Sequence, residues 1–341
     1  MKKIIRNADV LYQGKLQKVD VLFDENQILD VSENIQEECE VIDAAGLTLL
    51  PGLVDVHVHF RQPGHEEKET IHTGSLAAAH GGFTSVFAMP NVVPSPDGKE
   101  VMEEYLKLIE EESVVHTYPY GTITKKEQGK ELSDLSGMSQ LGVHWFSDDG
   151  VGMNDQNLLR EAKQKGGDVS AEVTVHHLLL EDKDVKGPMW KMNPPLRTHE
   201  DRMCLIEALE DGTLDFIAND HAPHTMRDKA RPMANSAFGI VSLETAFPLL
   251  YSEFVYRTKR WTLNQLVEWM SEKPAKRFGL NHVGKIEKGY TSDMFLVQLN
   301  QESMIDADTF ESKGKNTPFN GWSVYAEIKQ TIVNGKTVWK G

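Results

Sequence analysis

The sequence has little of what marks secreted, membrane-spanning or disulfide-stapled proteins. It contains two cysteines, Cys39 and Cys204, which cannot form a disulfide framework and which suit a reducing compartment. No stretch approaches the roughly eighteen consecutive apolar residues of a membrane helix. The first residues, MKKIIRNADVLYQG, contain no apolar segment of the kind that a signal peptide needs. We therefore expect a cytoplasmic protein that does not enter a membrane.

Basic side chains are outnumbered as well. The chain has 36 Lys and Arg against 52 Asp and Glu, which gives a formal net charge of −16 at pH 7. A phosphate backbone or an anionic membrane surface selects for Lys and Arg, so this charge argues against nucleic acid and membrane as partners. An anionic small molecule can still bind, but only beside a locally placed cation.

Short apolar runs separated by turn residues occupy both ends of the chain. They predict strands near residues 4–5, 21–23, 28–31, 41–43, 293–297 and 328–333. The dipeptide Asn334-Gly335 predicts a hairpin turn into a last strand at residues 336–339. Two strand-rich ends around a different middle predict one small β-sandwich domain that combines residues 1–50 with residues 285–341.

Strands alternate with helices through the middle of the chain, residues 51–284. The predicted helices include residues 75–79 and 99–112, and the six predicted strands lie near residues 49–56, 84–89, 114–120, 142–146, 169–174 and 214–218. Repeated βα units favour a parallel sheet, and a TIM-type (β/α)8 barrel is the leading form. The count of six units is two short of that barrel.

The strongest chemical signal is a pair of histidines at the end of the first strand of this middle part. Residues two apart on an extended chain point the same way, so the imidazoles of His57 and His59 face one centre, as barrel enzymes place a metal. Asp220 follows the last predicted strand, where a carboxylate can take a proton from an activated water and deliver it to a leaving nitrogen. Taken alone, such an aspartate is also a common helix or turn cap. The stretch Asp148-Asp149 ends the fourth predicted strand and by itself is typical of a turn.

Together these sites resemble the amidohydrolase superfamily, and within it the bacterial dihydroorotases whose metal-bridging group is an aspartate. The resemblance runs almost from end to end. It is carried by DVHVHFRQPG at residues 55–64, AMPN at 88–91, FSDDGVG at 146–152, KMNPPLR at 191–197, DHAPH at 220–224, AFGIV at 237–241 and LETA at 243–246. So many motifs in the same order exclude a chance match.

The resemblance implies a zinc-dependent cyclic amidohydrolase. His57, His59, Asp149 and Asp220 would hold one zinc ion, and Asp220 would also shuttle the proton. The implied reaction is the reversible hydrolysis of dihydroorotate to N-carbamoyl-L-aspartate in pyrimidine biosynthesis. A homodimer is implied by the same resemblance.

The resemblance also implies a pocket for a substrate that carries a carboxylate. Arg61 would bind that group, because a planar carboxylate is best met by a guanidinium fork. Without the resemblance, Arg61 is an ordinary surface arginine at a strand end. The other implied pocket residues are Asn91, which shares the carboxylate with Arg61, then Asn193 and His224, and the backbone of Phe238 and Gly239. Asparagine beside proline, as at both of these asparagines, is otherwise an ordinary turn former.

Two further features have no metal role in the family. His176 and His177 look like another ligand pair, but the resemblance assigns them to packing around the site. The polar run 225–236 joins two pocket segments, and it is either a mobile lid or a plain surface loop.

The chain departs from the family between Asp149 and Asn193. The family has two more βα units there, each of about 30 to 40 residues, and each brings a histidine for a second metal. Neither histidine motif exists in this chain. We place the junction between Gly152 and Asn157, followed by one helix at residues 157–165. Either a segment of the physical protein is missing from the sequence, which we favour, or the chain carries a true deletion.

Two alternatives stay open, a related cyclic amidase of the same fold and a non-catalytic subunit. A hydantoinase or allantoinase would bridge its metals with a carboxylated lysine on the fourth strand, where this chain has Asp148-Asp149. A non-catalytic, dihydroorotase-like subunit is favoured if the deletion is real. Six strands lack the partners that close an eight-stranded barrel, so a true deletion also predicts weak stability and lost activity.

Overall fold

The computed structural model describes residues 1–150 and 170–341. A four-stranded sheet in the order β5-β4-β1-β6 comes from the N-terminal residues alone. Strand β1 pairs antiparallel with β4 and parallel with β6. Its strands are β1 (Lys3–Arg6), β4 (Asp20–Phe23), β5 (Ile28–Ser32) and β6 (Glu40–Asp43).

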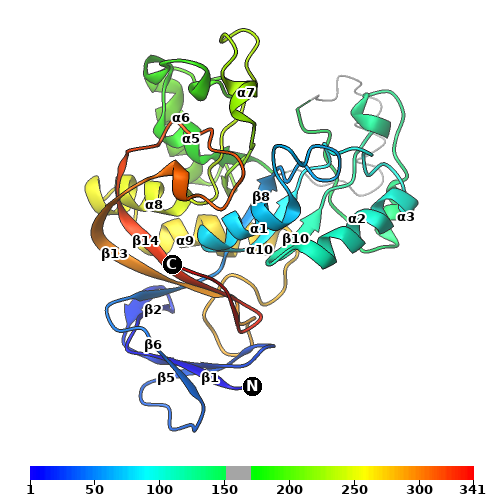
Figure 1. The fold of residues 1–341 in the computed structure, drawn as a ribbon. Coiled ribbons are helices and arrows are strands. Elements are labelled where there is room, and N and C mark those ends of the chain that lie inside the picture. The colour runs from blue at the N-terminus through cyan, green and yellow to red at the C-terminus, as the bar shows by residue number, and fades with distance from the viewer. Residues whose placement is uncertain (151–169) are drawn as a thin grey trace.

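A second, six-stranded sheet combines both ends of the chain in the order β15-β14-β13-β7-β2-β3. The long strands β13 and β14 run from this sheet up along the helices of the middle part (Figure 1). The link between the two ends is the antiparallel pair β13·β7, in which Met294 lies opposite Pro51. The strands are β2 (Asp9–Tyr12), β3 (Lys15–Gln17), β7 (Thr48–Pro51), β13 (Met294–Met304), β14 (Ser323–Val333) and β15 (Lys336–Lys340).

The two sheets share one apolar core. It is formed by buried side chains from both ends of the chain, among them Ile5, Val10, Val21, Phe23, Ile28, Leu49, Met294, Leu296 and Ile332. Burial of each such side chain contributes about 1.5 to 3 kcal/mol. The strands of both ends therefore stabilise each other, while a domain division at residues 50 and 285 stays a prediction.

Parallel strands form the middle part. One sheet has the order β10-β9-β8, with β8 (Leu53–Val58), β9 (Phe83–Ala88) and β10 (His116–Pro119), and a second sheet pairs β11 (Glu172–Thr174) with β12 (Phe216–Ala218). A bridge between Val58 and His221 connects the two sheets. Within residues 1–150 and 170–341 these strands form no closed barrel.

Helices cover the parallel strands. Helix α1 (Ile71–His80) begins with a capping box between Thr70 and Thr73, and α2 (Lys99–Glu112) buries Met102, Tyr105 and Ile109 on one face. The other α-helices are α3 (Leu135–Ser139), α5 (Val175–Leu179), α6 (His199–Asp211), α7 (Met226–Lys229), α8 (Ala246–Leu250), α9 (Leu263–Val267) and α10 (Lys273–Arg277). The π-helical segments η4 (Tyr251–Arg257) and η5 (Glu268–Glu272) continue α8 and α9, and short 3-10 turns lie at Lys125–Glu127, Asp182–Asp184, Pro188–Trp190 and Ala307–Thr309.

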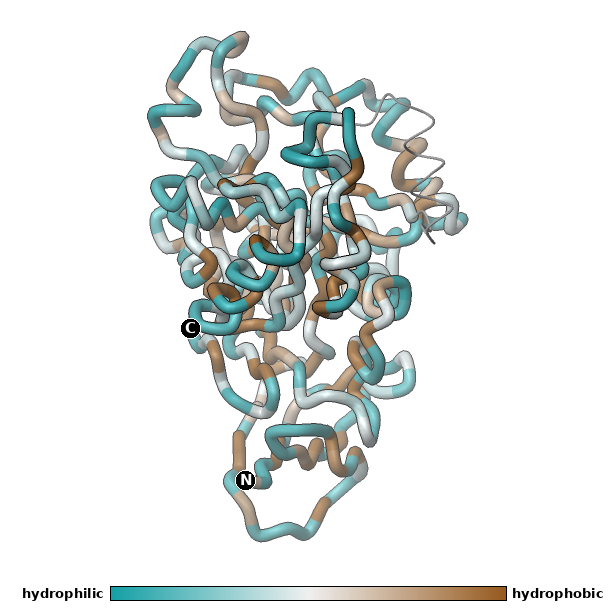
Figure 2. Tube along the Cα trace, turned by 90° about the vertical axis from the view of Figure 1, so that its right-hand side faces the viewer, coloured by the Kyte–Doolittle hydropathy of each residue, from teal (hydrophilic) through white to brown (hydrophobic). Residues whose placement is uncertain are grey.

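The hydropathy of the chain follows this layering. In Figure 2 the hydrophobic segments run through the interior, and hydrophilic loops lie at the outer ends of the elongated molecule. None of the helices described is long and apolar enough to cross a membrane.

Several predictions on the elements need correction. The fourth strand predicted at residues 142–146 is wrong, because Phe146 alone forms a bridge, with Gly121. Gly142 has a φ of 85° in the turn that follows α3, which ends any extended run there. The predicted junction at residues 152–157, the helix at 157–165 and the start of the strand at Val169 lie outside the described residues. The hairpin turn at Asn334-Gly335 is confirmed, since β14 and β15 flank it.

Candidate metal and substrate site

A buried aspartate fixes the strand that carries the two histidines. Asp55 of β8 is fully buried and accepts hydrogen bonds from the backbone of His57 at 3.2 Å and from the backbone and side chain of Asn219 at 3.1 and 2.8 Å. Burial raises the pKa of Asp55 to about 7, against the effect of these hydrogen bonds. Because Asn219 precedes Asp220, this contact sets the position of Asp220 relative to β8.

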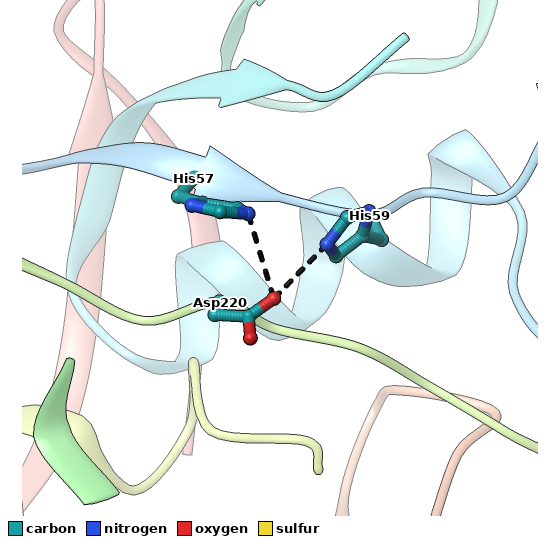
Figure 3. A group of neighbouring side chains, drawn as sticks. All are labelled: His57, His59 and Asp220. Carbon is teal, nitrogen blue, oxygen red and sulfur yellow. Dashed lines mark hydrogen bonds and ion pairs between the residues drawn. The ribbon is translucent and has the colours of Figure 1, made fainter. Parts of the chain in front are cut away.

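Figure 3 shows the result: two imidazoles and one carboxylate point toward one centre. Nε2 of His59 lies 3.0 Å from Oδ1 of Asp220, and Nε2 of His57 lies 3.5 Å from the same oxygen. Asp149 approaches from the loop after Phe146, with its oxygens 3.5 Å from Nε2 of His57 and of His59. The ligand atoms of His57, His59 and Asp220 all lie within 4.8 Å of one another.

The hydrogen bonds on the far side of each ring leave Nε2 available to a cation. Nδ1 of His59 lies 2.9 Å from Oδ1 of Asn91, and Nδ1 of His57 lies 2.5 Å from Oε1 of Glu172. An acceptor at Nδ1 assigns the proton to that nitrogen and the lone pair to Nε2. Among the described residues, Nε2 of His57 is buried without a hydrogen bond, and it lies 3.5 Å from oxygens of Asp149 and Asp220. Two imidazole nitrogens and two carboxylates therefore fit a divalent metal ion.

The charged groups of the site shift the pKa values of one another. Burial raises the pKa of Asp149, but its contact with His57 and the charge of His59 hold that pKa below its usual range. The pKa of Asp220 is lowered in the same way, against burial, by His57 and His59. Burial lowers the pKa of His57, while Glu172 and Asp220 raise it well above its usual value. Both carboxylates are therefore charged at neutral pH and face the two ring nitrogens.

A cavity of about 550 Å³ opens onto these side chains. All ten predicted site residues line it: His57, His59, Arg61, Asn91, Asp149, Asn193, Asp220, His224, Phe238 and Gly239. The structure thus brings together residues that are up to 182 positions apart (from 57 to 239). Their individual roles stay proposals.

Arg61 supplies a cation at this cavity. It has a left-handed backbone, with a φ of 63°, and its Nε donates to the carbonyl of Pro223 at 3.4 Å. Burial lowers the pKa of Arg61, while the charges of Asp220 and Asp149 oppose that effect. No ion pair within residues 1–150 and 170–341 engages its guanidinium, which is therefore open to an anionic ligand.

Glu172 and Asp55 are the functional candidates that sequence reasoning missed. Asp55 is an acidic residue inside an otherwise apolar predicted strand, and this contrast was the available signal; the predicted strand of Glu172 also holds Ser170 and Thr174, so its signal was weaker. His176 is buried, with neither ring nitrogen hydrogen-bonded within the described part, and burial lowers its pKa to about 3. His177 lies at the cavity, where its Nδ1 is 2.6 Å from Oγ1 of Thr174.

The run 225–236 is anchored to the pocket by a buried lysine. Lys229 of α7 donates to the carbonyls of Ala237 at 3.1 Å and Gly239 at 3.0 Å. Burial lowers the pKa of Lys229 to about 8. A lid that moves as a whole would have to break both hydrogen bonds, so the anchored half of this run favours a fixed loop.

Comparisons with known proteins identify the family. A family described as Dihydro-orotase-like matches residues 46–187. The chain is 40% identical to the dihydroorotase of Bacillus cereus over 411 positions, which cover 96% of each protein. It is 39% identical to the dihydroorotase of Bacillus cytotoxicus, with 100% of this chain and 99% of the relative covered. The chain belongs to the dihydroorotase family.

The same alignments confirm that the chain is shorter than its dihydroorotase relatives. The alignment with the Bacillus cytotoxicus protein spans 424 positions, and this chain has 341 residues, so at least 83 positions have no counterpart in it. Two βα units of about 30 to 40 residues each would occupy nearly that length.

Solved structures confirm the coarse fold. The L-hydantoinase of Arthrobacter aurescens has a TM-score of 0.88 at 23% identity, covering 99% of this chain and 96% of that one. The dihydropyrimidinase of Brevibacillus agri has a TM-score of 0.83 at 21% identity, with 100% and 95% covered. The chain has the TIM-type amidohydrolase fold of these proteins, with mixed sheets and no closed barrel in the part that is described.

Proposed function

We propose that the chain is a dihydroorotase that hydrolyses dihydroorotate reversibly to N-carbamoyl-L-aspartate with one zinc ion. The observation that carries the proposal is the convergence of His57, His59, Asp149 and Asp220 at one end of a cavity that Arg61 also lines. The names of the relatives supply the reaction, and the side chains supply the chemistry that it needs.

Zinc suits the donor set better than magnesium or calcium, which prefer oxygen ligands alone. His57 and His59 would bind it through Nε2, and Asp149 and Asp220 through carboxylate oxygens. When bound, zinc polarises an amide carbonyl and lowers the pKa of water. The two family histidines of a second metal are absent from the sequence, so one ion is the expected content.

Asp220 is the proposed proton shuttle. Its Oδ1 faces both histidines, at 3.0 and 3.5 Å, which leaves Oδ2 for the reacting water. In hydrolysis Asp220 accepts the proton of the attacking water and delivers it to the ring nitrogen as the carbon–nitrogen bond breaks. The reverse order of proton transfers closes the ring. A charged carboxylate at neutral pH is the form that this role requires.

Arg61 is the proposed reader of the substrate carboxylate. It is a cation that lines the cavity together with the metal ligands, and a guanidinium meets a carboxylate with two parallel hydrogen bonds. Asn91, Asn193, His224 and the backbone of Phe238 and Gly239 would hold the rest of the ring. A hydantoin or a dihydropyrimidine has no carboxylate for Arg61, so we favour dihydroorotate over the substrates named in the structural neighbours.

At least 83 aligned positions have no counterpart in this chain, and this difference in length favours a second candidate function, a non-catalytic dihydroorotase-like subunit. Against it stands the complete set of ligand side chains, which converge at one cavity. Purified chain loaded with one equivalent of zinc should hydrolyse dihydroorotate, and it should hydrolyse dihydrouracil and hydantoin far more slowly. Zinc binding without any turnover of the three would favour the non-catalytic subunit. Faster turnover of an uncharged ring would reassign the substrate class.

The cytoplasmic location and the homodimer are further proposals, which rest on the sequence and on the family resemblance. Light scattering on the purified chain tests the second: a mass of twice 38.4 kDa is expected.

A further inference from the structure

A buried asparagine far along the chain joins two segments that line the cavity, residues 220–224 and residues 237–241. Asn316 is fully buried in the segment 312–316, between β13 and β14. Its Nδ2 donates to the carbonyls of Ala222 and Gly239, each at 3.1 Å. Its Oδ1 accepts the backbone N–H of His224 at 3.0 Å, and its own carbonyl accepts the N–H of Val241 at 3.1 Å. Every polar group of the residue except its backbone N–H is thus used on the pocket segments.

The orientation of this amide follows from its partners. Two carbonyl oxygens face one end of the amide, and an N–H faces the other, so only one assignment of oxygen and nitrogen satisfies all three contacts. Neither leucine nor aspartate offers two donors and an acceptor in this arrangement. The position therefore requires the amide of asparagine.

The backbones of segments 220–224, 237–241 and 312–316 lie too close together to shift easily relative to one another. A Cβ atom on Gly239, which has a φ of 104°, would lie 2.5 Å from Cβ of Ala222. A Cβ atom on Gly314 would lie 2.7 Å from a side-chain carbon of Val241 and 2.8 Å from Cβ of Pro223. The segment 312–316 is therefore packed against both pocket segments without a spare layer of side chains.

The segment 312–316 also binds Glu69, which lies beside His221, the residue after Asp220. Ser312 and the backbone N–H of Lys313, at 3.2 Å, hydrogen-bond to the buried Glu69. Glu69 in turn lies 3.6 Å from Nε2 of His221. Residues 312–316 thus bond directly to residues 222 and 224, and they reach His221 through Glu69.

We propose that Asn316 is a positioning residue for the substrate side of the site, which sets the distance between segment 220–224 and segment 237–241. Asn316 touches neither the metal ligands nor the reacting atoms; it acts through the backbones of His224 and Gly239. The inference rests on the proposed function for its kinetic part and on the hydrogen bonds alone for its structural part. Loss of the amide should loosen substrate binding and leave zinc binding intact.

Three variants test this. Asn316→Asp keeps the volume and the acceptor for His224 but loses both donors, and Asn316→Ala loses all three side-chain contacts. Asn320→Ala is the matched control, because Asn320 lies in the same connection and its Oδ1 accepts from Ala307 at 2.9 Å, away from the pocket. Amide hydrogen exchange of the zinc-loaded proteins, with zinc affinity measured in parallel, reads the structural part.

We expect faster exchange in segments 220–224 and 237–241 of both Asn316 variants, with unchanged zinc affinity. For dihydroorotate we expect a KM raised about tenfold or more, with kcat changed less than about threefold, as for one or two lost hydrogen bonds. Wild-type exchange in both segments would overturn the inference, and so would a fall in zinc affinity equal to the rise in KM. If the wild-type chain shows no turnover, the proposed function fails while hydrogen exchange still decides the role of Asn316.

Discussion

Nδ1 of His57 lies 2.5 Å from Oε1 of Glu172, at the start of β11. The carboxylate thereby orients the imidazole whose other nitrogen faces Asp149 and Asp220. Carboxylates placed on the far nitrogen of a metal-binding histidine fix the tautomer and raise the basicity of the ligand. The relationship joins β8 to β11 across the site.

Removal of this carboxylate should weaken the metal site. Glu172→Ala is expected to lower zinc affinity by about 10- to 100-fold, because His57 loses its fixed tautomer. Glu172→Gln keeps an acceptor and should lose less. The control is Glu181→Ala, which removes the carboxylate of the Glu181–His199 pair away from the cavity. Equal zinc affinity in wild type and Glu172→Ala, measured by competition with a chelating dye, would reject the role.

The two histidines of β8 should be indispensable for metal binding. His57→Ala combined with His59→Ala removes both imidazole ligands and should abolish bound zinc and activity together. His144→Ala combined with His199→Ala, at two exposed histidines, is the control for the loss of two rings. Elemental analysis that finds full zinc content in the β8 double variant would show that the metal binds elsewhere.

Arg61 should set the preference for a carboxylate. Arg61→Met is expected to cost about 2 to 4 kcal/mol of transition-state binding for dihydroorotate, as for a lost charge-assisted pair, and far less for dihydrouracil. Arg260→Met is the control, because Arg260 pairs with Glu210 on the surface, and it should leave kcat/KM unchanged for both substrates. The measurement is kcat/KM for both substrates. Equal losses on the two would show that another group reads the carboxylate.

An ion pair between the middle part and the terminal sheets predicts a pH dependence of stability. Nε2 of His116 on β10 lies 3.2 Å from Oδ2 of the buried Asp293, just before β13. Burial lowers the pKa of His116, but the hydrogen bond and charge of Asp293 raise it above its ordinary value of 6.5. A raised folded pKa stabilises the protein fully below the unfolded pKa, and this contribution is lost as pH rises through the folded pKa.

The free energy of unfolding of His116→Gln should therefore fall below that of wild type at pH 5 to 6 and approach it at higher pH. His144→Gln, at an exposed histidine, should show no such trend. Urea unfolding across this pH range gives the comparison. A deficit that stays constant with pH would mean that packing of the ring, and not its charge, stabilises the protein.

Features that depend on neighbouring residues along the chain could be predicted from the sequence. Helix α2 begins and ends at the predicted residues because its apolar positions Met102, Tyr105 and Ile109 repeat with the period of a helix. The pair His57 and His59 could be placed on one face because side chains alternate along a strand. The resemblance then brought distant motifs to the same cavity, where all ten named residues lie.

Other features depend on contacts that no local pattern encodes. The strand expected at residues 142–146 does not form, because in the described part Phe146 alone of this stretch pairs with another segment, at Gly121. The contact of Glu172 with His57 spans 115 positions of sequence, and that of Asn316 with Ala222 spans 94. A single sequence shows such residues only as polar side chains in apolar or loop surroundings.

The mass of the natural protein distinguishes a segment that is missing from the sequence from a true deletion. The sequence corresponds to 38.4 kDa, and the family resemblance predicts two more βα units. Intact mass spectrometry of the protein from its source should give a larger value if a segment is missing from the sequence. A value of 38.4 kDa would establish a true deletion and would make weak thermal stability the expectation.

The proposed function is tested most directly by the turnover of dihydroorotate, measured for the zinc-loaded chain and for Asp220→Asn at equal zinc content. Asparagine keeps an oxygen toward the two histidines but cannot accept the proton. The proposed function predicts measurable hydrolysis by the wild-type chain with one zinc ion, and a rate about 100 to 10,000 times lower in the variant. Equal rates, or no turnover by a folded wild-type chain that holds zinc, would contradict it.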